Sequence, residues 1–190
     1  RVIQLYKHIS SKNSSLFNHV LQFFDLLPKR NYTARHFVFI RYDAIDLLPN
    51  SSLNGDDFFK ILGIKLWYDG SPYAGSMYIK DPYLENNFTK NILNIPSRHS
   101  GFPLLTKSKL NFYINTYQSK GWQIAIHAQG DQAIKEILNS FEDVENQLKN
   151  DYRHRLEHCL LIEESSIKQM SKLNIHPSFH INYLYYYGNS

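Results

Sequence analysis

The chain has 190 residues, 43% hydrophobic and 20% charged, which is the balance of an ordinary soluble globular domain. Its formal charge of +4 comes from scattered Lys and Arg, without the basic cluster that would indicate nucleic-acid binding. No apolar stretch is long enough for a transmembrane helix, so we expect neither a nucleic-acid nor a membrane partner. The single cysteine and the lack of a signal-peptide pattern favour a cytoplasmic location.

The first part of the chain, 1–35, is predicted to be helical. Apolar residues repeat at helical spacing within 14–27, and a proline ends the pattern. The run HFVFIRY at 36–42 predicts a strand, and the apolar run ILGIKLWYDG at 61–70 predicts a second one. Prolines then interrupt a segment rich in Tyr, Asn and Ser at 71–105, which we expect to be a long loop over the mouth of the fold.

Helices and strands alternate in the rest of the chain. The predicted elements are a helix at 106–120, a strand between Gly121 and Gly130, a helix at 131–148, a strand within 152–161, a helix at 163–173 and a strand at 175–181. Thr106 is suited to cap the first of these helices. This alternation predicts parallel βα units and therefore an α/β fold.

Polar side chains lie at the carboxyl ends of the predicted strands. They are Lys65, Asp69, His127, Asp131, Glu157, His158, Ser178 and His180. His127 and His158 are about one βα unit apart, so neighbouring parallel strands would bring their imidazoles to one mouth. Two neutral imidazoles are suited to a divalent metal such as zinc, whose sites need three or four ligands.

Simpler interpretations of the same residues remain open. The run RHRLEHC could be a charged strand end whose histidine only caps a neighbouring group. Lys65, within an apolar run, could lie on the solvent side of an edge strand or extend along Trp67. Cys159, next to His158, would point to the opposite side of a strand and is expected to be a small buried side chain.

Four segments carry a resemblance to a known family. They are GIKLWYDGSPYAGSMYIKDPYL, GWQIAIHAQGDQAI, RHRLEHCLLI and PSFHINYLYYYG. Together and in this order they resemble the amidohydrolase superfamily, in particular its branch with N-substituted formamide deformylase and the exoenzyme-regulatory-protein-like amidohydrolases. The resemblance implies a TIM-like (β/α)8 barrel with a small terminal β-sandwich. It also implies a metal centre that hydrolyses amide-type C–N bonds of a small-molecule substrate.

The resemblance implies a role for each matching residue. His127 and His158 match metal ligands at the ends of the family's fifth and sixth strands. Lys65 matches a fourth-strand lysine that many members carboxylate to bridge two metals, so one or two divalent ions, with zinc expected, would bind. His180 is predicted to polarise the substrate, and Asp69 is predicted as a second catalytic group. The residues expected to contact the substrate or orient the ligands are Ser71, Asp131, Arg155, Glu157 and Ser178.

Two family features have no counterpart in the sequence: the H-x-H pair of the first strand and the aspartate of the eighth. We therefore expect 1–190 to be an internal part of one amidohydrolase barrel domain, covering strands three to seven and lacking the β-sandwich. The parent enzyme would hydrolyse non-peptide C–N bonds through a metal-activated water. The alternatives are a metal-dependent esterase or phosphotriesterase on this fold, or a truncated chain without activity. This chain alone is expected to be inactive.

Overall fold

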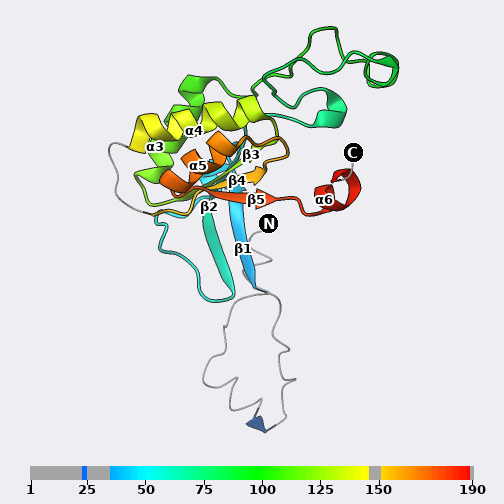
Figure 1. Cartoon of the computed structure of the whole chain (residues 1–190). Coiled ribbons are helices and arrows are strands. Elements are labelled where there is room, and N and C mark those ends of the chain that lie inside the picture. Colours follow the sequence, from blue (N-terminus) through cyan, green and yellow to red (C-terminus); the bar gives the residue numbers. More distant parts are fainter. Residues whose placement is uncertain (1–22, 25–34, 146–150, 189–190) are drawn as a thin grey trace.

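The computed structural model describes residues 23–24, 35–145 and 151–188 (Figure 1). The predicted N-terminal helical part, 1–35, lies outside these residues except for three positions. The predicted helix at 131–148 is described as far as its position 145. None of the described helices is long and apolar enough to cross a membrane.

Five parallel strands form one sheet. They are β1 (His36–Arg41), β2 (Phe59–Trp67), β3 (Gln123–Ala128), β4 (Arg155–His158) and β5 (His176–Phe179). Each strand pairs with the one that follows it in the chain, in the order β1-β2-β3-β4-β5. The described residues contain no second sheet. This sequential parallel order is that of a TIM-like barrel over part of its circumference, and the predicted fold is confirmed.

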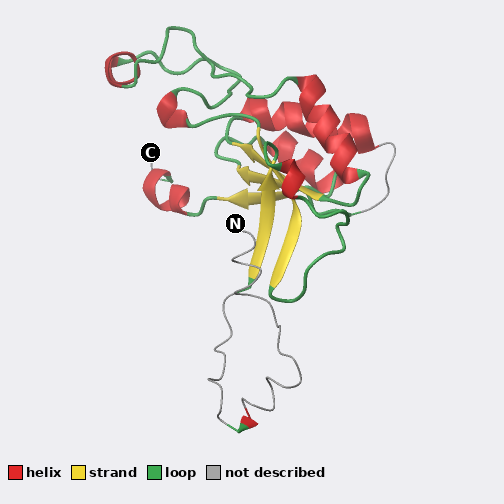
Figure 2. Cartoon of the chain, turned by 180° about the vertical axis from the view of Figure 1, so that it is seen from behind, coloured by secondary structure: helices red, strands yellow, loops and turns green. Residues whose placement is uncertain are grey.

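Helices cover one side of this sheet (Figure 2). The connecting helices are α3 (Lys107–Gln118), α4 (Asp131–Glu145) and α5 (Glu164–Lys172), and a short helix, α6 (Asn182–Tyr187), follows β5. The Thr106 hydroxyl caps α3 as predicted, because it accepts a hydrogen bond from the Lys109 amide at 3.3 Å. The loop at 71–105 contains only a 3-10 turn (Pro72–Ala74) and a π turn (Phe88–Ile92).

The two faces of the sheet differ in chemistry because successive side chains of a strand point to opposite sides. The side chains against the helices are fully buried and apolar, and they are Ile64, Leu66, Ile124, Ile126 and Leu156. The other face, which is the inner face of a barrel, carries partly buried and mostly polar groups. These are Lys65, Trp67, Gln123, His127, Arg155 and Glu157. The fold therefore separates an apolar core from a polar inner surface.

Lys65 does not lie on an edge strand. Strand β2 pairs with β1 on one side and with β3 on the other, so this simpler interpretation is wrong. The second interpretation agrees with the structure, because Lys65 Nζ lies 5.6 Å from the centre of the Trp67 ring. The amine therefore lies over the Trp67 ring on the inner face of the sheet.

A buried histidine holds three elements of the core together. His154, just before β4, is 5% exposed and stacks on Phe141 and Tyr152 at ring distances of 5.0 and 5.5 Å. Its Nδ1 accepts from the Ile124 amide at 3.0 Å, so Nε2 carries the proton toward Gln118 Oε1 at 3.1 Å. Burial lowers the pKa of His154 to about 4. The imidazole is thus neutral with both nitrogens used.

This neutral imidazole predicts a loss of stability in acid. The folded pKa is about 4 and the ordinary value is 6.5, so the unfolded chain binds the proton first. The free energy of unfolding should be fully retained above pH 6.5 and should fall between pH 6.5 and 4. His154 would account for at most about 3 kcal/mol of that fall. Urea unfolding across this range measures it.

The matched variants are His154→Gln, which removes the titrating group, and His176→Gln, which removes an exposed histidine. The pH dependence should shrink in the first variant and stay unchanged in the second. Equal pH dependence in all three proteins would contradict this assignment.

Candidate metal centre at the carboxyl ends of the strands

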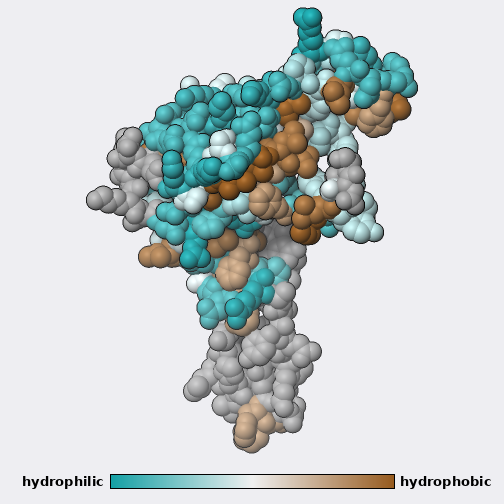
Figure 3. Space-filling model, in the orientation of Figure 1, coloured by the Kyte–Doolittle hydropathy of each residue, from teal (hydrophilic) through white to brown (hydrophobic). Residues whose placement is uncertain are grey.

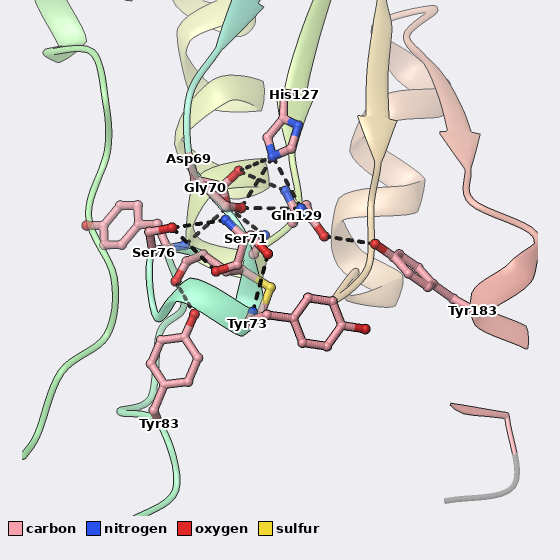
Figure 4. Close-up of polar contacts among 12 residues, drawn as sticks. Asp69, Gly70, Ser71, Tyr73, Ser76, Tyr83, His127, Gln129 and Tyr183 are labelled. Atoms are coloured by element: carbon pink, nitrogen blue, oxygen red, sulfur yellow. Dashed lines mark hydrogen bonds and ion pairs between the residues drawn. The ribbon is translucent and has the colours of Figure 1, made fainter. Parts of the chain in front are cut away.

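His127 lies near the end of β3 on the inner face, beside Trp67 of β2 and Glu157 of β4. Its Nε2 has three polar neighbours (Figure 4): the Gly70 carbonyl oxygen at 3.3 Å, Asp69 Oδ1 at 3.6 Å and the side-chain nitrogen Nε2 of Gln129 at 3.3 Å. Two of these three are acceptors, which favours the proton on Nε2. Nδ1 then keeps its lone pair.

The ring of His158 lies beside that of His127 because the backbone at the end of β4 departs from regular strand geometry. Strict alternation would direct its side chain to the helix-covered face, together with Leu156 two positions earlier. Instead its φ is 78° and that of Cys159 is 46°, both in the left-handed region. The His158 ring lies 4.6 Å from the His127 ring, centre to centre. Cys159 is 2% exposed, so its predicted burial is confirmed.

The surroundings of both imidazoles favour the neutral form. Burial is the largest cause that lowers the pKa of His127, and the same is true of His158. The charge of Lys65 lowers both pKa values further, and Glu157 acts in the opposite direction. Neutral imidazoles from neighbouring strands have the donor chemistry that zinc takes in proteins. The pair therefore fits a divalent metal by donor type.

Lys65 lies on the inner face of β2. Trp67, two residues further along this strand, pairs with His127 of β3. Burial lowers the pKa of the Lys65 amine to about 8, while Glu157 raises it and Arg155 lowers it. At pH 7 a lysine with this pKa is neutral in about one molecule in ten, far more than at its ordinary pKa. The neutral amine is the form that can react as a nucleophile.

Asp69 is fully buried, which is unusual for a carboxylate. Its oxygens accept backbone N–H groups of Gln129 at 3.0 Å, Gly130 at 2.9 Å and Tyr78 at 3.1 Å. Burial raises its pKa to about 6, and these three N–H groups oppose that shift. Its oxygens are therefore enclosed between the turn after β3 and the loop after β2. The catalytic role of Asp69 stays a prediction, and these contacts indicate that its carboxylate also positions that turn and that loop.

The third predicted imidazole lies at the rim. His180 follows β5 by one residue and is exposed. Its ring centre is 6.2 Å from that of His158 and 4.6 Å from that of Tyr183. His127, His158 and His180 thus form a row across three strand ends. Within the described residues, no three His, Cys, Asp or Glu side chains form a complete metal site.

Three further predicted residues lie on the inner face below this row. Arg155 Nη2 and Glu157 Oε1 form an ion pair of 2.7 Å on β4. The Glu157 side chain is 15% exposed. Ser178 is the neighbour of Glu157 on β5 and is partly buried. These groups lie next to the imidazoles in the strand register.

Ser71 and Asp131 are not part of the imidazole row. The Ser71 hydroxyl accepts from the Tyr73 amide at 3.3 Å and caps the 3-10 turn. Asp131 begins α4, and its Oδ1 accepts from the Lys80 amide at 3.1 Å. Both side chains shape the loop that follows β2.

The sequence prediction omitted Gln129. This residue is 5% exposed, and its amide contacts the Gly70 carbonyl oxygen and the ring of His127. Its Oε1 accepts from the Tyr183 hydroxyl of α6 at 3.4 Å (Figure 4). The sequence holds one signal that could have identified Gln129, because this side-chain amide comes two residues after the histidine near the end of the strand.

Comparisons with known proteins decide the family. The amidohydrolase family profile matches residues 19–189. The chain belongs to the amidohydrolase family. The branch suggested by the motifs stays a prediction.

Two relatives illustrate how distant the sequence similarity is. YtcJ of Bacillus subtilis (strain 168), whose name describes it as an amidohydrolase, is 22% identical over 144 residues, or 76% of this chain and 25% of YtcJ. Protein LONG AFTER FAR-RED 3 of Arabidopsis thaliana is 28% identical over 125 residues, or 64% of this chain and 19% of that protein. The chain thus spans a quarter or less of the length of these two relatives.

Solved structures agree on the fold. Two crystal structures of uncharacterised metal-dependent hydrolases, from Pyrococcus horikoshii OT3 and Pyrococcus furiosus, each superpose with a TM-score of 0.62. Their sequences are 24% and 23% identical to this amidohydrolase chain. The matches cover 79% and 88% of this chain, and 28% and 32% of those proteins. At such identity the likeness establishes the fold alone.

Replacing Asp69 tests its positioning role. In Asp69→Asn an amide NH2 would face backbone N–H donors, so at least one buried donor loses its acceptor. We expect the free energy of unfolding to fall by about 2–3 kcal/mol. Asp131→Asn is the control, because that carboxylate accepts one N–H group in a partly exposed position. Urea unfolding that shows equal losses in both variants would contradict the role assigned to Asp69.

Proposed function

We propose that this chain supplies metal ligands to a hydrolase that cleaves amide-type, non-peptide C–N bonds of a small molecule. One observation carries the proposal: the imidazoles of His127 and His158 lie together at the carboxyl ends of adjacent parallel strands. This is the end of a barrel where ligands bind. Membership of the amidohydrolase family supports the same chemistry.

His127 and His158 would each give one nitrogen lone pair. The Gly70 carbonyl and Asp69 favour the proton on Nε2 of His127, so Nδ1 is the proposed donor. When bound, a divalent metal supplies a Lewis acid and lowers the pKa of water toward about 7. We propose zinc, because nitrogen donors are among its usual ligands.

Lys65 would supply a further ligand after carboxylation. Its neutral amine can add to CO2 with loss of one proton to solvent, and the resulting carbamate is an anion whose oxygens suit a divalent metal. The lowered pKa of Lys65 supports this step, because it makes the neutral amine available. The carbamate charge would be balanced by the metal.

His180 and Gln129 would act on the substrate side. His180 is exposed at the rim, so a ring N–H can donate to a substrate carbonyl and polarise it. Gln129 links the ring of His127 to Tyr183 of α6. It would therefore keep the rim at a fixed distance from the ligands.

The ligand assignment predicts metal loss on mutation. In the intact protein that carries this chain, His127→Ala or His158→Ala should weaken metal binding at least about tenfold, because one of three or four ligands is missing. Elemental analysis of the purified variants measures bound metal per protein. His176→Ala is the control, since that histidine is exposed at the start of β5. Full metal occupancy in both ligand variants would overturn the assignment.

The carboxylation proposal predicts a CO2 adduct on Lys65. Native mass spectrometry of the metal-loaded protein should show the added mass of one CO2, which disappears in Lys65→Ala. Lys65→Arg should also lose metal, because guanidinium stays cationic and cannot become a ligand. A short carboxylate added to Lys65→Ala should restore part of the metal binding.

Lys60→Ala is the control, because Lys60 lies on the same strand near its amino end. An unmodified Lys65 in a fully metal-loaded and active protein would exclude carboxylation while leaving the two histidine ligands in place.

A further inference from the structure

An open pocket of about 480 Å³ lies along the loop at 71–105. Pockets of this size hold small organic ligands. Its lining includes Met77, Asp81, Leu84, Phe88, Asp131 and Leu161. Most of these side chains are apolar, and two are carboxylates.

The loop is seated firmly on the end of the sheet. A Cβ at Gly130 would lie 1.9 Å from the Tyr78 carbonyl oxygen, so the loop backbone packs directly against the turn after β3. The Tyr78 amide donates to Asp69 and its hydroxyl to Glu136 of α4, at 3.1 Å each. The Lys80 amide donates to Asp131. These contacts fix the inner wall of the pocket.

Contacts within the loop fix its outer wall. The Tyr83 hydroxyl donates to the Met77 carbonyl oxygen at 3.0 Å (Figure 4), and the Tyr83 ring stacks on His99. His99 Nε2 reaches the Gly75 carbonyl oxygen at 2.8 Å. The amides of Ile79 and Tyr83 pair with the carbonyls of Ser100 and His99. The pocket is therefore built by the fold of the loop.

The pocket lining includes one residue that follows β3 and one that follows β4, the strands that carry the two imidazoles. Asp131 begins the helix that follows the His127 strand, and Leu161 lies three positions after His158. The Leu161 amide donates to the Gln129 carbonyl oxygen at 2.9 Å, which ties that wall to the end of β3. A molecule with its reacting group at the imidazoles could thus extend into this pocket.

The lining leaves apolar surface uncovered. Leu84 is 79% exposed and Phe88 is 52% exposed. Figure 3 shows brown and tan atoms on the part of the loop that extends to the upper right. Burying such side chains against an apolar group is favourable by about 25 cal/mol per Å². The pocket lining offers no Lys or Arg side chain, and Asp81 and Asp131 give it negative character.

We infer that this loop pocket binds the apolar arm of the amide substrate and selects arms that are neutral or cationic over arms that carry a carboxylate. The inference rests on the proposed hydrolase function. The apolar lining supplies the affinity, and the two carboxylates repel an anionic arm. The substrate class is therefore an amide with an aromatic or branched aliphatic substituent and no acid on it.

Three probes of one shape test the charge preference. They are N-benzylacetamide, its para-aminomethyl derivative and its para-carboxy derivative, which are neutral, cationic and anionic. Isothermal titration calorimetry with the intact, chelator-treated protein should give an affinity for the carboxy probe about tenfold weaker than for the other two. Equal affinity for the three probes, or no binding of any, would overturn the inference.

Two pairs of variants locate the site. Phe88→Ala should weaken binding of the neutral probe by about three- to tenfold, whereas Phe112→Ala on α3, also about half exposed, should not. Asp81→Lys should shift the preference toward the carboxy probe by about fivefold, whereas Asp57→Lys, before β2, should leave it unchanged. Equal effects within either pair would place the probes elsewhere and overturn the inference.

The outcome separates this inference from the proposed function. Binding is measured without metal and without turnover, so it does not depend on catalysis. Probes that bind with the stated charge preference but are not hydrolysed by the metal-loaded protein count against the hydrolase proposal alone. Metal binding and amide hydrolysis without that preference count against the pocket alone.

Discussion

The buried carboxylate of Asp69 is the constraint on which the rest of the site depends. It accepts N–H groups from the turn after β3 and from the loop after β2, and it lies 3.6 Å from His127 Nε2. A buried charge is costly unless hydrogen bonds compensate it, and here three backbone donors do so. One side chain thus fixes two strand ends, the inner wall of the loop pocket and the orientation of an imidazole.

The imidazole pair also depends on an irregularity of β4. His158 occupies a left-handed backbone conformation at the strand end, which is uncommon for a residue with a side chain. Such a conformation persists only where surrounding contacts hold it, and it often marks a functional site. Here it brings the ring of His158 to 4.6 Å from that of His127. The regular strands provide the frame, and this departure completes the pair.

Periodicity predicted the parallel βα units because the apolar residues of β2, β3 and β4 face the same helices. Strand ends also predicted which polar residues would lie near one another. Two features were beyond such patterns. The burial of Asp69 depends on N–H donors from Gln129 and Gly130, sixty and sixty-one positions later. The position of His158 depends on a φ angle that residue type does not reveal. The loop pocket likewise arises from contacts within an irregular segment.

The most direct test of the account is nitrogen NMR of the intact protein with labelled histidines during a zinc titration. The account predicts that the His127 and His158 resonances shift together with one metal equivalence point, and that the His127 shift is largest at Nδ1. Zinc that binds with full occupancy while both imidazoles keep their metal-free chemical shifts would contradict it.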